Sequence, residues 1–493
     1  MKLDIVNTLI KKRALILIFI AFALLYTIIS FINHSLFRTY ALDLGVYNHA
    51  VYSFSQFKSA VFTLGIDGNE VSFLATHFSL ITILYAPLVY IFGSFTLLVI
   101  QIASILFGGY FIYKYALNFL GNNPKLPYWI LIHFFSIWGI YSALSFDYHD
   151  NVLGAMLIPA FVYYVEKRNM KLSALLLILI LFTKEVMAVW LFFILIGLII
   201  KNRKSYYKTY INFELPLLIF CFIYGLVVIF FLMPMLQGET NNLQFIRYNY
   251  LGNSVFEIIV NVFKNPKLIV DVLFTNTLND PSYDYIKMET YIMFILAGGL
   301  FCFFKPAYLI MLLPIFAQKF LSNDYGFWGI NGQYSIEFVP IISLATIDFI
   351  RNYKKNQVVA MIIITLITLG TNIKTIESRE SKWYNAANTK FYNKMHFKTE
   401  LDIAQVNEAL KLIEKESSVS ASSSIVPHIA FREKIYHFPI IKEADYIALF
   451  KNRDFWPLTL ESFNDNLKQL KADNLYSVIF ESEDLILFKK SSK

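Results

Sequence analysis

Hydrophobic residues along the chain are gathered in long runs that short polar segments separate. The first uncharged run, Ala14–Ile32, is long enough for a bilayer-spanning helix, which needs about 20 apolar residues. Lys11–Arg13 precede it, so the positive-inside rule predicts a cytoplasmic N-terminus. We expect a retained first helix and not a cleaved signal peptide, because the bulky segment Phe31–Tyr40 offers no small-residue cleavage site. The further apolar runs cover 78–93, 95–119, 128–145, 151–165, 172–200, 212–235, 289–304, 306–320, 337–350 and 357–371.

Basic clusters at 166–171, 201–204 and 351–355, together with Lys305, mark the predicted cytoplasmic ends of these runs. If each run between the first helix and the cluster at 166–171 crossed the membrane, that cluster would not be cytoplasmic, so the run 78–93 is expected not to cross. This run contains Pro87 and is expected to lie on the external side as a re-entrant or interfacial segment. The run 172–200 has basic residues on both flanks and is interrupted by Lys184-Glu185. It therefore predicts two helices that turn outside at 183–185, and about eleven crossings in total.

The tail from 372 is polar and has a different pattern. Residues 400–416 show a helical period, and 458–470 predict a second helix. Short strands are predicted at 418–423, 434–439, 444–450 and 476–488. The predicted fold is an all-α polytopic membrane protein, residues 1–371, with a small C-terminal α/β extracytoplasmic domain, residues 372–493.

Composition agrees with a multi-pass protein of the cytoplasmic (inner) membrane. The chain is 57% hydrophobic and only 16% charged, which excludes a water-soluble enzyme and a disordered chain. Its net charge of +8 is typical of cytoplasmic loops, so no nucleic-acid partner is expected. The two cysteines lie in apolar runs and predict neither a disulfide framework nor a Cys-based metal site.

Most polar residues with catalytic potential fall in the predicted external loops. Asp43 follows the first helix and is a candidate general base or metal ligand, or merely a helix N-cap. One short turn contains three polar residues, Asp147, His149 and Asp150. They could supply ligands to a divalent cation or a base near a phosphate. The alternative is that they only form the turn. Since no Walker A, GxGxxG or HExxH motif occurs, nucleotide-driven transport and zincin proteolysis gain no support.

Charged residues inside the apolar runs need a partner. Lys184 and Glu185 either neutralise each other or another charge, or Lys184 binds an anionic group such as a lipid phosphate. Arg38 and Arg247 are further candidates for binding phosphate, and His77 is an interface histidine or a ligand. Gln333 lies in the fifth external loop.

Several motifs resemble a family of bacterial polytopic membrane proteins known as a domain of unknown function, which is grouped with the GT-C glycosyltransferases. The likeness covers nearly the whole chain. The matching stretches are Asp43–Asn48, His77–Ser79, Ala86–Leu88, Phe146–His149, Lys184-Glu185, Ser418–Ser422, Val426–His428 and Arg432–Tyr436.

The resemblance implies an acidic catalytic residue in the first external loop, a position that Asp43 occupies. Relatives often have a second acidic group in the next external turn, where Asp147 and Asp150 lie. It implies an inverting transfer from a polyprenyl-phosphate sugar. The chain departs from the pattern of many relatives because Asp43 has no acidic partner next to it. We expect substrate contacts from Lys184, Glu185, Arg247, His77, Tyr47 and Gln333, and a Mg²⁺ or Mn²⁺ site, if present, at Asp43, Asp147 and His149.

The sequence thus predicts a GT-C-type membrane glycosyltransferase that moves a hexosyl or pentosyl group at the extracytoplasmic face. The partners expected are the polyprenyl-phosphate sugar donor, a glycan, lipid or protein acceptor, and membrane lipids. The alternative is a lipid or polysaccharide transporter (flippase) that uses Lys184 and Glu185 as a relay. The alternative is weakened because charge lies almost only at the helix ends and no internal repeat is visible.

Overall fold

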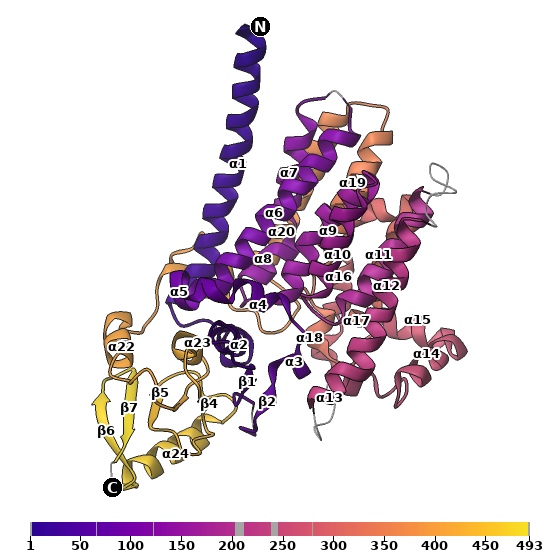
Figure 1. Cartoon of the computed structure of the whole chain (residues 1–493). Coiled ribbons are helices and arrows are strands. Elements are labelled where there is room, and N and C mark those ends of the chain that lie inside the picture. The colour runs from indigo at the N-terminus through magenta and orange to yellow at the C-terminus, as the bar shows by residue number, and fades with distance from the viewer. Residues whose placement is uncertain are drawn as a thin grey trace.

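The computed structural model describes residues 2–65, 67–121, 123–202, 212–237, 245–278 and 280–491. Arg203 and Lys204 of the predicted basic cluster lie outside these residues. The chain forms a bundle of long helices with a small mixed α/β domain at one end, and α1 stands out from the bundle at the N-terminus (Figure 1). The principal helices of the bundle are α1 (Lys2–Ser35), α6 (Thr96–Phe119), α7 (Leu126–Ser136), α8 (Trp138–Leu144), α9 (Asp150–Glu166), α10 (Met170–Leu181), α11 (Met187–Asn202), α12 (Glu214–Val227), α16 (Ile286–Leu296), α17 (Pro306–Phe320), α19 (Phe338–Asn352) and α20 (Gln357–Glu377).

Apart from 78–93, each predicted apolar run corresponds to one or two of these helices. The run 172–200 divides into α10 and α11 at the predicted turn, because Lys184 and Glu185 interrupt the apolar sequence there. The run 128–145 divides into α7 and α8, bent by 45° at Ile137. Helix α20 continues to Glu377, past the domain boundary predicted at 372.

Among the described residues, four helical stretches are long and apolar enough to cross a membrane, or five if α7 and α8 form one span. The four are Lys12–Ser35, Ile81–Phe119, Glu214–Gln237 and Gln357–Glu377. Helices α10, α11 and α17 are apolar but shorter. The protein is therefore a multi-pass membrane protein, whereas the count of eleven crossings and the orientation of the termini stay predictions.

The segment predicted not to cross, 78–93, is a series of short pieces that precedes α6. It consists of α4 (Ile81–Tyr85), the 3-10 turn η2 (Ala86–Leu88) and α5 (Val89–Phe92), and η3 (Gly93–Phe95) then leads into α6. Pro87 and Gly93, which has a φ of +54°, lie at the breaks. Figure 1 shows α4 and α5 at the end of the bundle that faces the α/β domain.

The rest of the first loop is made of small elements that pack against the α/β domain. They are η1 (Ala41–Gly45), a single turn of π-helix, then α2 (Val46–Ser55), β1 (Val61–Phe62), β2 (Val71–Ser72) and α3 (Phe73–Thr76). Between α12 and α16 the described elements are η4 (Val228–Leu232), α13 (Met233–Gln237), η5 (Phe245–Tyr248), α14 (Val255–Lys264), α15 (Pro266–Phe274) and η6 (Pro281–Tyr283). η7 (Gly299–Phe304) precedes α17, and α18 (Tyr325–Trp328) precedes α19.

The C-terminal domain contains a five-stranded sheet of order β4-β3-β5-β7-β6. Strand β3 pairs in parallel with β4 and β5, while β7 pairs antiparallel with β5 and β6. The predicted strands are confirmed, and the last one forms a hairpin. The elements are α21 (Ala386–Thr389), η8 (Lys394–Phe397), α22 (Ile403–Leu410), β3 (Val419–Ala421), α23 (Val426–Ile429), β4 (Ile435–His437), β5 (Tyr446–Phe450), α24 (Leu460–Ala472), β6 (Tyr476–Glu481) and β7 (Leu485–Lys490).

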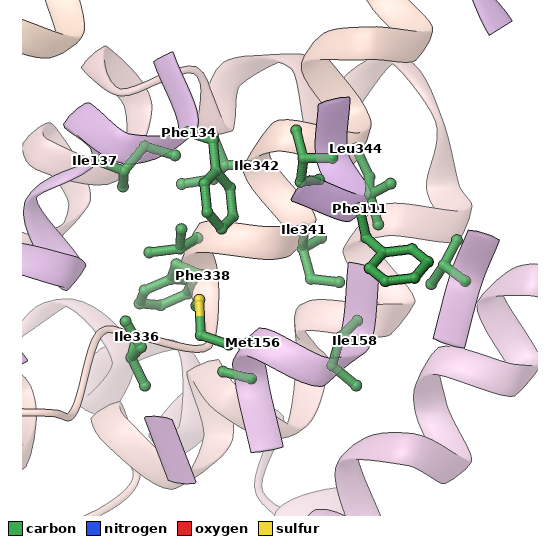
Figure 2. Packing of buried hydrophobic residues seen from close by; sticks show 14 of the residues in the cluster. Phe111, Phe134, Ile137, Met156, Ile158, Ile336, Phe338, Ile341, Ile342 and Leu344 are labelled. Atoms are coloured by element: carbon green, nitrogen blue, oxygen red, sulfur yellow. The ribbon is translucent and has the colours of Figure 1, made fainter. Parts of the chain in front are cut away.

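Two hydrophobic cores hold these parts together. The larger lies inside the bundle, where Phe111, Phe134, Met156 and Phe338 interdigitate from four helices (Figure 2). The second joins the first loop to the C-terminal domain, for example through Leu44 and Val426. The first loop therefore depends on the C-terminal domain for its shape.

Candidate functional site

The loop that carries Asp43 is fixed to the end of α1 and to the C-terminal region. Arg38, predicted as a candidate phosphate ligand, is largely buried, and its guanidinium donates to four backbone carbonyls. Those carbonyls belong to Ala387 (3.0 Å), Met395 (3.3 Å), His396 (2.9 Å) and Lys398 (2.6 Å). Arg38 is thus committed to holding the chain and is not available for a phosphate.

Asp147 supports the turn that presents Asp43. Its Oδ2 accepts the backbone N–H of Tyr40 at 2.8 Å and that of Leu44 at 3.4 Å, on either side of Asp43. Gln101 holds the Asp147 turn from α6, donating to the Asp147 carbonyl at 3.1 Å and accepting the N–H of His149 at 3.0 Å. Burial, and then the negative charge of Asp43, raise the pKa of Asp147 well above its usual value. Asp147 is therefore a buried residue whose hydrogen bonds hold the turn that contains Asp43.

Asp43 itself is partly open. Its side chain is 31% exposed, and Oδ1 lies 3.1 Å from Nε2 of His149, whose side chain is only 5% exposed. His149 stacks on Phe146 with ring centroids 5.5 Å apart, so the imidazole plane is fixed. Nδ1 of His149 has no hydrogen-bond partner among the described residues, which is consistent with Nε2–H donating to the carboxylate. The pair uses Oδ1 of Asp43, and no residue in the described part of the chain forms a hydrogen bond with the second oxygen.

Asp43 faces a cavity of about 150 Å³, here called the Asp43 cavity. Seven residues predicted from the sequence line it: Asp43, Tyr47, His77, His149, Lys184, Arg247 and Gln333. The remaining lining residues are Asn151, Val186, Ile315, Gln318, Lys319, Phe327, Tyr334 and Glu337. Asp147 and Glu185 are not among them, so they act behind the cavity wall.

Two cations of the cavity are held in place by carboxylates. Lys184 Nζ lies 3.3 Å from Oδ1 of Asp150, a side chain with 0% exposure. Arg247 Nε donates to Asp324 Oδ2 at 2.9 Å, and its guanidinium lies 4.5 Å from the ring centroid of Phe327. Both positive groups are thus fixed at the wall of a cavity that also contains Asp43.

Glu185 does not pair with Lys184. Its Oε2 accepts the backbone N–H of Phe78 at 3.2 Å, which ties the turn between α10 and α11 to the His77-Phe78-Ser79 segment. His77 stacks on Tyr47, with centroids 5.5 Å apart. Burial, and then the charge of Lys184, lower the pKa of His77 to about 4. His77 therefore lines the cavity as a neutral imidazole at neutral pH.

Asn151 and Lys319 also belong to this site, although neither was predicted from the sequence. Asn151 Nδ2 donates to Glu337 Oε1 at 2.7 Å, joining the start of α9 to the start of α19. Lys319 is buried and donates to the carbonyls of Gly329 (2.8 Å) and Tyr334 (2.9 Å). The lone lysine in the apolar run 306–320 could have indicated that Lys319 belongs to a polar site, because a charged side chain inside a membrane needs a local partner.

The metal site predicted at Asp43, Asp147 and His149 does not fit the arrangement of these side chains. In the described part of the chain, no three His, Cys, Asp or Glu side chains gather so that they could hold a metal ion. Asp43 and His149 contact each other directly, and Asp147 Oδ2 is used by two backbone N–H groups. The divalent cation stays a prediction.

Comparison with solved structures shows the fold. The crystal structure of ArnT from Cupriavidus metallidurans, bound to undecaprenyl phosphate, matches with a TM-score of 0.55 at 10% sequence identity. The match covers 96% of this chain and 97% of that chain. At this level of identity the likeness shows that the two chains share their fold. No curated protein matches the sequence.

Comparison with family models shows the relationship by sequence. The matching model extends over residues 33–487, which include every residue of the Asp43 cavity. The chain therefore belongs to the family described as "Predicted membrane protein (DUF2079)".

Proposed function

We propose that the protein is a membrane glycosyltransferase that moves a hexosyl or pentosyl group from a polyprenyl-phosphate-linked sugar to an acceptor hydroxyl at the extracytoplasmic face, with inversion. One observation carries the proposal. A partly exposed carboxylate, Asp43, shares a cavity with the fixed cations Lys184 and Arg247. Transfer from a sugar phosphate requires a base that accepts the proton of the acceptor hydroxyl. It also requires positive groups that stabilise the departing phosphate.

The lipid class of the donor follows from the fold and from the membrane setting. A structure with the same fold holds undecaprenyl phosphate. This chain is also a multi-pass membrane protein, so a lipid-linked donor can reach it by diffusion in the bilayer. The phosphate of such a donor would lie at the polar wall formed by Lys184 and Arg247.

The proposed reaction is a single displacement. Asp43 accepts the proton of the acceptor hydroxyl, whose oxygen forms a bond to the anomeric carbon. The bond between that carbon and the phosphate oxygen breaks, its electron pair leaves with the polyprenyl phosphate, and the configuration inverts. Lys184 and Arg247 stabilise the negative charge that develops on the departing phosphate. His149 fixes the carboxylate of Asp43 in the orientation for proton transfer.

The polar groups on the far wall suit a sugar. Glu337 and Asn151 form a buried hydrogen-bonded pair, and Gln333 and Tyr334 lie beside them. Fixed acceptors and donors of this kind discriminate hydroxyl patterns, because an unmatched buried polar group costs free energy. These residues are proposed to recognise the sugar hydroxyls.

The test uses the full chain in proteoliposomes, with undecaprenyl-phosphate-linked hexoses and pentoses that carry a radiolabelled sugar and with extracted membrane glycolipids as acceptors. Asp43→Asn should lower turnover by about 10²–10⁴-fold while the protein stays folded. Asp67→Asn is the matched control, because Asp67 lies in the same loop, is exposed and is not part of the cavity. Wild-type turnover in Asp43→Asn would remove Asp43 from the mechanism. Movement of intact donor across sealed vesicles without sugar transfer would favour the transporter instead.

A further inference from the structure

A second, larger cavity lies at the other end of the helix bundle. It measures about 340 Å³ and is here called the Lys305 cavity. Its lining residues are Phe301, Phe304, Lys305, Tyr308, Ala345, Asp348, Phe349, Asn352, Tyr353 and Lys354. None of them lines the Asp43 cavity.

Two helices show that the cavities are at opposite ends. Helix α17 contributes Tyr308, near its start, to the Lys305 cavity and Lys319, near its end, to the Asp43 cavity. In α19 the order is reversed, with Glu337 just before its first residue and Asn352 as its last. Fifteen helical residues rise roughly 22 Å, most of the thickness of a bilayer core. The Lys305 cavity therefore lies near the opposite membrane surface, the cytoplasmic one in the predicted topology.

The cavity floor is a buried charge network. Asp348 accepts from Lys305 Nζ at 2.7 Å and from the Tyr308 hydroxyl at 2.6 Å, and Lys201 Nζ lies 3.4 Å away. Lys201 also pairs with Glu166 at 2.7 Å. Two lysines thus face two carboxylates, so the floor is neutral and its side chains are fixed.

Lys354 adds a positive charge that this network does not balance. It is exposed, and it forms no ion pair or hydrogen bond with any residue that the structure describes. Arg351, which precedes it on the same segment, lies over the ring of Phe119. The mouth of the cavity therefore carries an excess of positive charge and suits an anion.

The rim is apolar on the side of η7. Phe304, which lines the cavity, is 65% exposed, and its neighbours in η7, Leu300 and Phe303, are 48% and 57% exposed. In a membrane protein such side chains face lipid tails, and aromatic residues are enriched at the headgroup level. A ligand for this cavity would combine a phosphate with hydrocarbon chains.

We propose that the Lys305 cavity is a binding site for an anionic phospholipid. The phosphate lies against Lys354 and Lys305, and the acyl chains pass over Phe303 and Phe304 into the bilayer. The site is independent of the sugar-transfer reaction, because it shares no residue with the Asp43 cavity.

The test measures lipid retained by the full chain after purification in detergent, delipidation and addition of phosphatidylglycerol, phosphatidylcholine or inorganic phosphate. Native mass spectrometry counts the bound molecules. Phosphatidylglycerol should bind with a defined stoichiometry and in preference to phosphatidylcholine. Lys354→Gln should weaken binding about fivefold, and Lys305→Gln with Lys354→Gln should weaken it further.

Lys355→Gln is the matched control, because Lys355 is the exposed neighbour of Lys354 and does not line the cavity. Lys354 is itself exposed, so its variant should fold. Equal retention by the Lys354 and Lys355 variants would overturn the proposal. Equal binding of the two lipids, or inorganic phosphate that binds as tightly as the lipid, would also overturn it.

Discussion

Lys184 Nζ lies 3.3 Å from Oδ1 of Asp150, and the Asp150 side chain is completely buried. This pair joins the turn between α10 and α11 to the first residue of α9, and it places the lysine at the cavity wall. Sequence alone allowed a structural or a phosphate-binding role for Lys184. The geometry allows the two roles to be separated.

Lys184→Met leaves the buried carboxylate of Asp150 without its cation, so we expect destabilisation of about 3–5 kcal/mol. In the double variant Lys184→Met with Asp150→Asn, most of this stability should return because no unpaired charge remains. If Lys184 also binds the donor phosphate, turnover stays low in the double variant and KM for the donor rises. Thermal unfolding in detergent and the sugar-transfer assay measure the two effects. Full turnover in the double variant would assign Lys184 to structure alone.

Asp147 and Asp43 should respond differently to the same substitution. Because burial and the neighbouring Asp43 raise the pKa of Asp147, its neutral form is favoured. Asn is neutral, has the same shape and still offers an oxygen to the N–H groups of Tyr40 and Leu44. Asp147→Asn should therefore keep turnover within about tenfold of wild type, far less than the loss expected from removing a general base.

Asp147→Ala serves as the contrasting variant. It leaves the buried backbone N–H of Leu44 and the partly buried N–H of Tyr40 without an acceptor, and a buried unsatisfied group costs about 1–3 kcal/mol. It should therefore lower both stability and turnover. A loss of turnover in Asp147→Asn as large as in Asp43→Asn would restore Asp147 as a catalytic residue.

Gly45 lies where the Asp43 turn meets the C-terminal domain. A Cβ at this position would come within 2.8 Å of Cγ1 of Val426. Gly45→Ala should therefore cost about 1–3 kcal/mol by overpacking and should lower turnover by displacing Asp43. Adding Val426→Ala removes the clash and should recover stability and turnover together, as a double-mutant cycle would show. Additive losses in the cycle would contradict this contact.

Asp454 makes the stability of the C-terminal region depend on pH. It accepts from the Ser424 hydroxyl at 2.7 Å, and burial raises its pKa to about 6 from an ordinary 3.8. Stability from a carboxyl whose pKa is raised on folding is present below the unfolded value and is lost as pH rises through the folded value. The thermal midpoint of wild type relative to Asp454→Asn should therefore fall as the pH rises from about 4 to about 7. A pH-independent difference would show that Asp454 has an ordinary pKa.

Chelation tests the predicted cation directly. Because no three ligating side chains gather among the described residues, EDTA should leave turnover of the purified protein unchanged. A loss restored by Mg²⁺ or Mn²⁺, but not by Ca²⁺, would establish the cation and require ligands from the substrate.

The long apolar runs predicted most of the bundle helices, because a helix that crosses a bilayer needs about 20 mainly apolar residues. The break at Lys184-Glu185 and the strands of the C-terminal domain also follow from local sequence. The small elements of the external loops do not, and the number of crossings stays a prediction. Helices such as α8 and α18 are too short to leave a periodic signal, and their positions depend on tertiary contacts.

The roles of individual polar residues were harder to predict. Arg38 and Asp147 have the chemistry of ligands, yet both make hydrogen bonds to backbone groups far away in sequence. Such partners are created by the fold, so no local pattern reveals them. The sequence could suggest functional roles for Asp43, Lys184 and Arg247. A charged side chain near an apolar run costs free energy unless a partner or a ligand offsets its charge.

The dependence of the Asp43 loop on the C-terminal domain has a consequence for the timing of synthesis. Ala41 N–H donates to the Ser423 hydroxyl, and Arg453 donates to the Phe37 carbonyl. Asp43 leaves the ribosome long before either of these partners exists. A nascent or truncated chain thus inserts its helices without the surface that shapes the proposed base. Under the proposed function, turnover therefore begins only after residues 423–453 have been made.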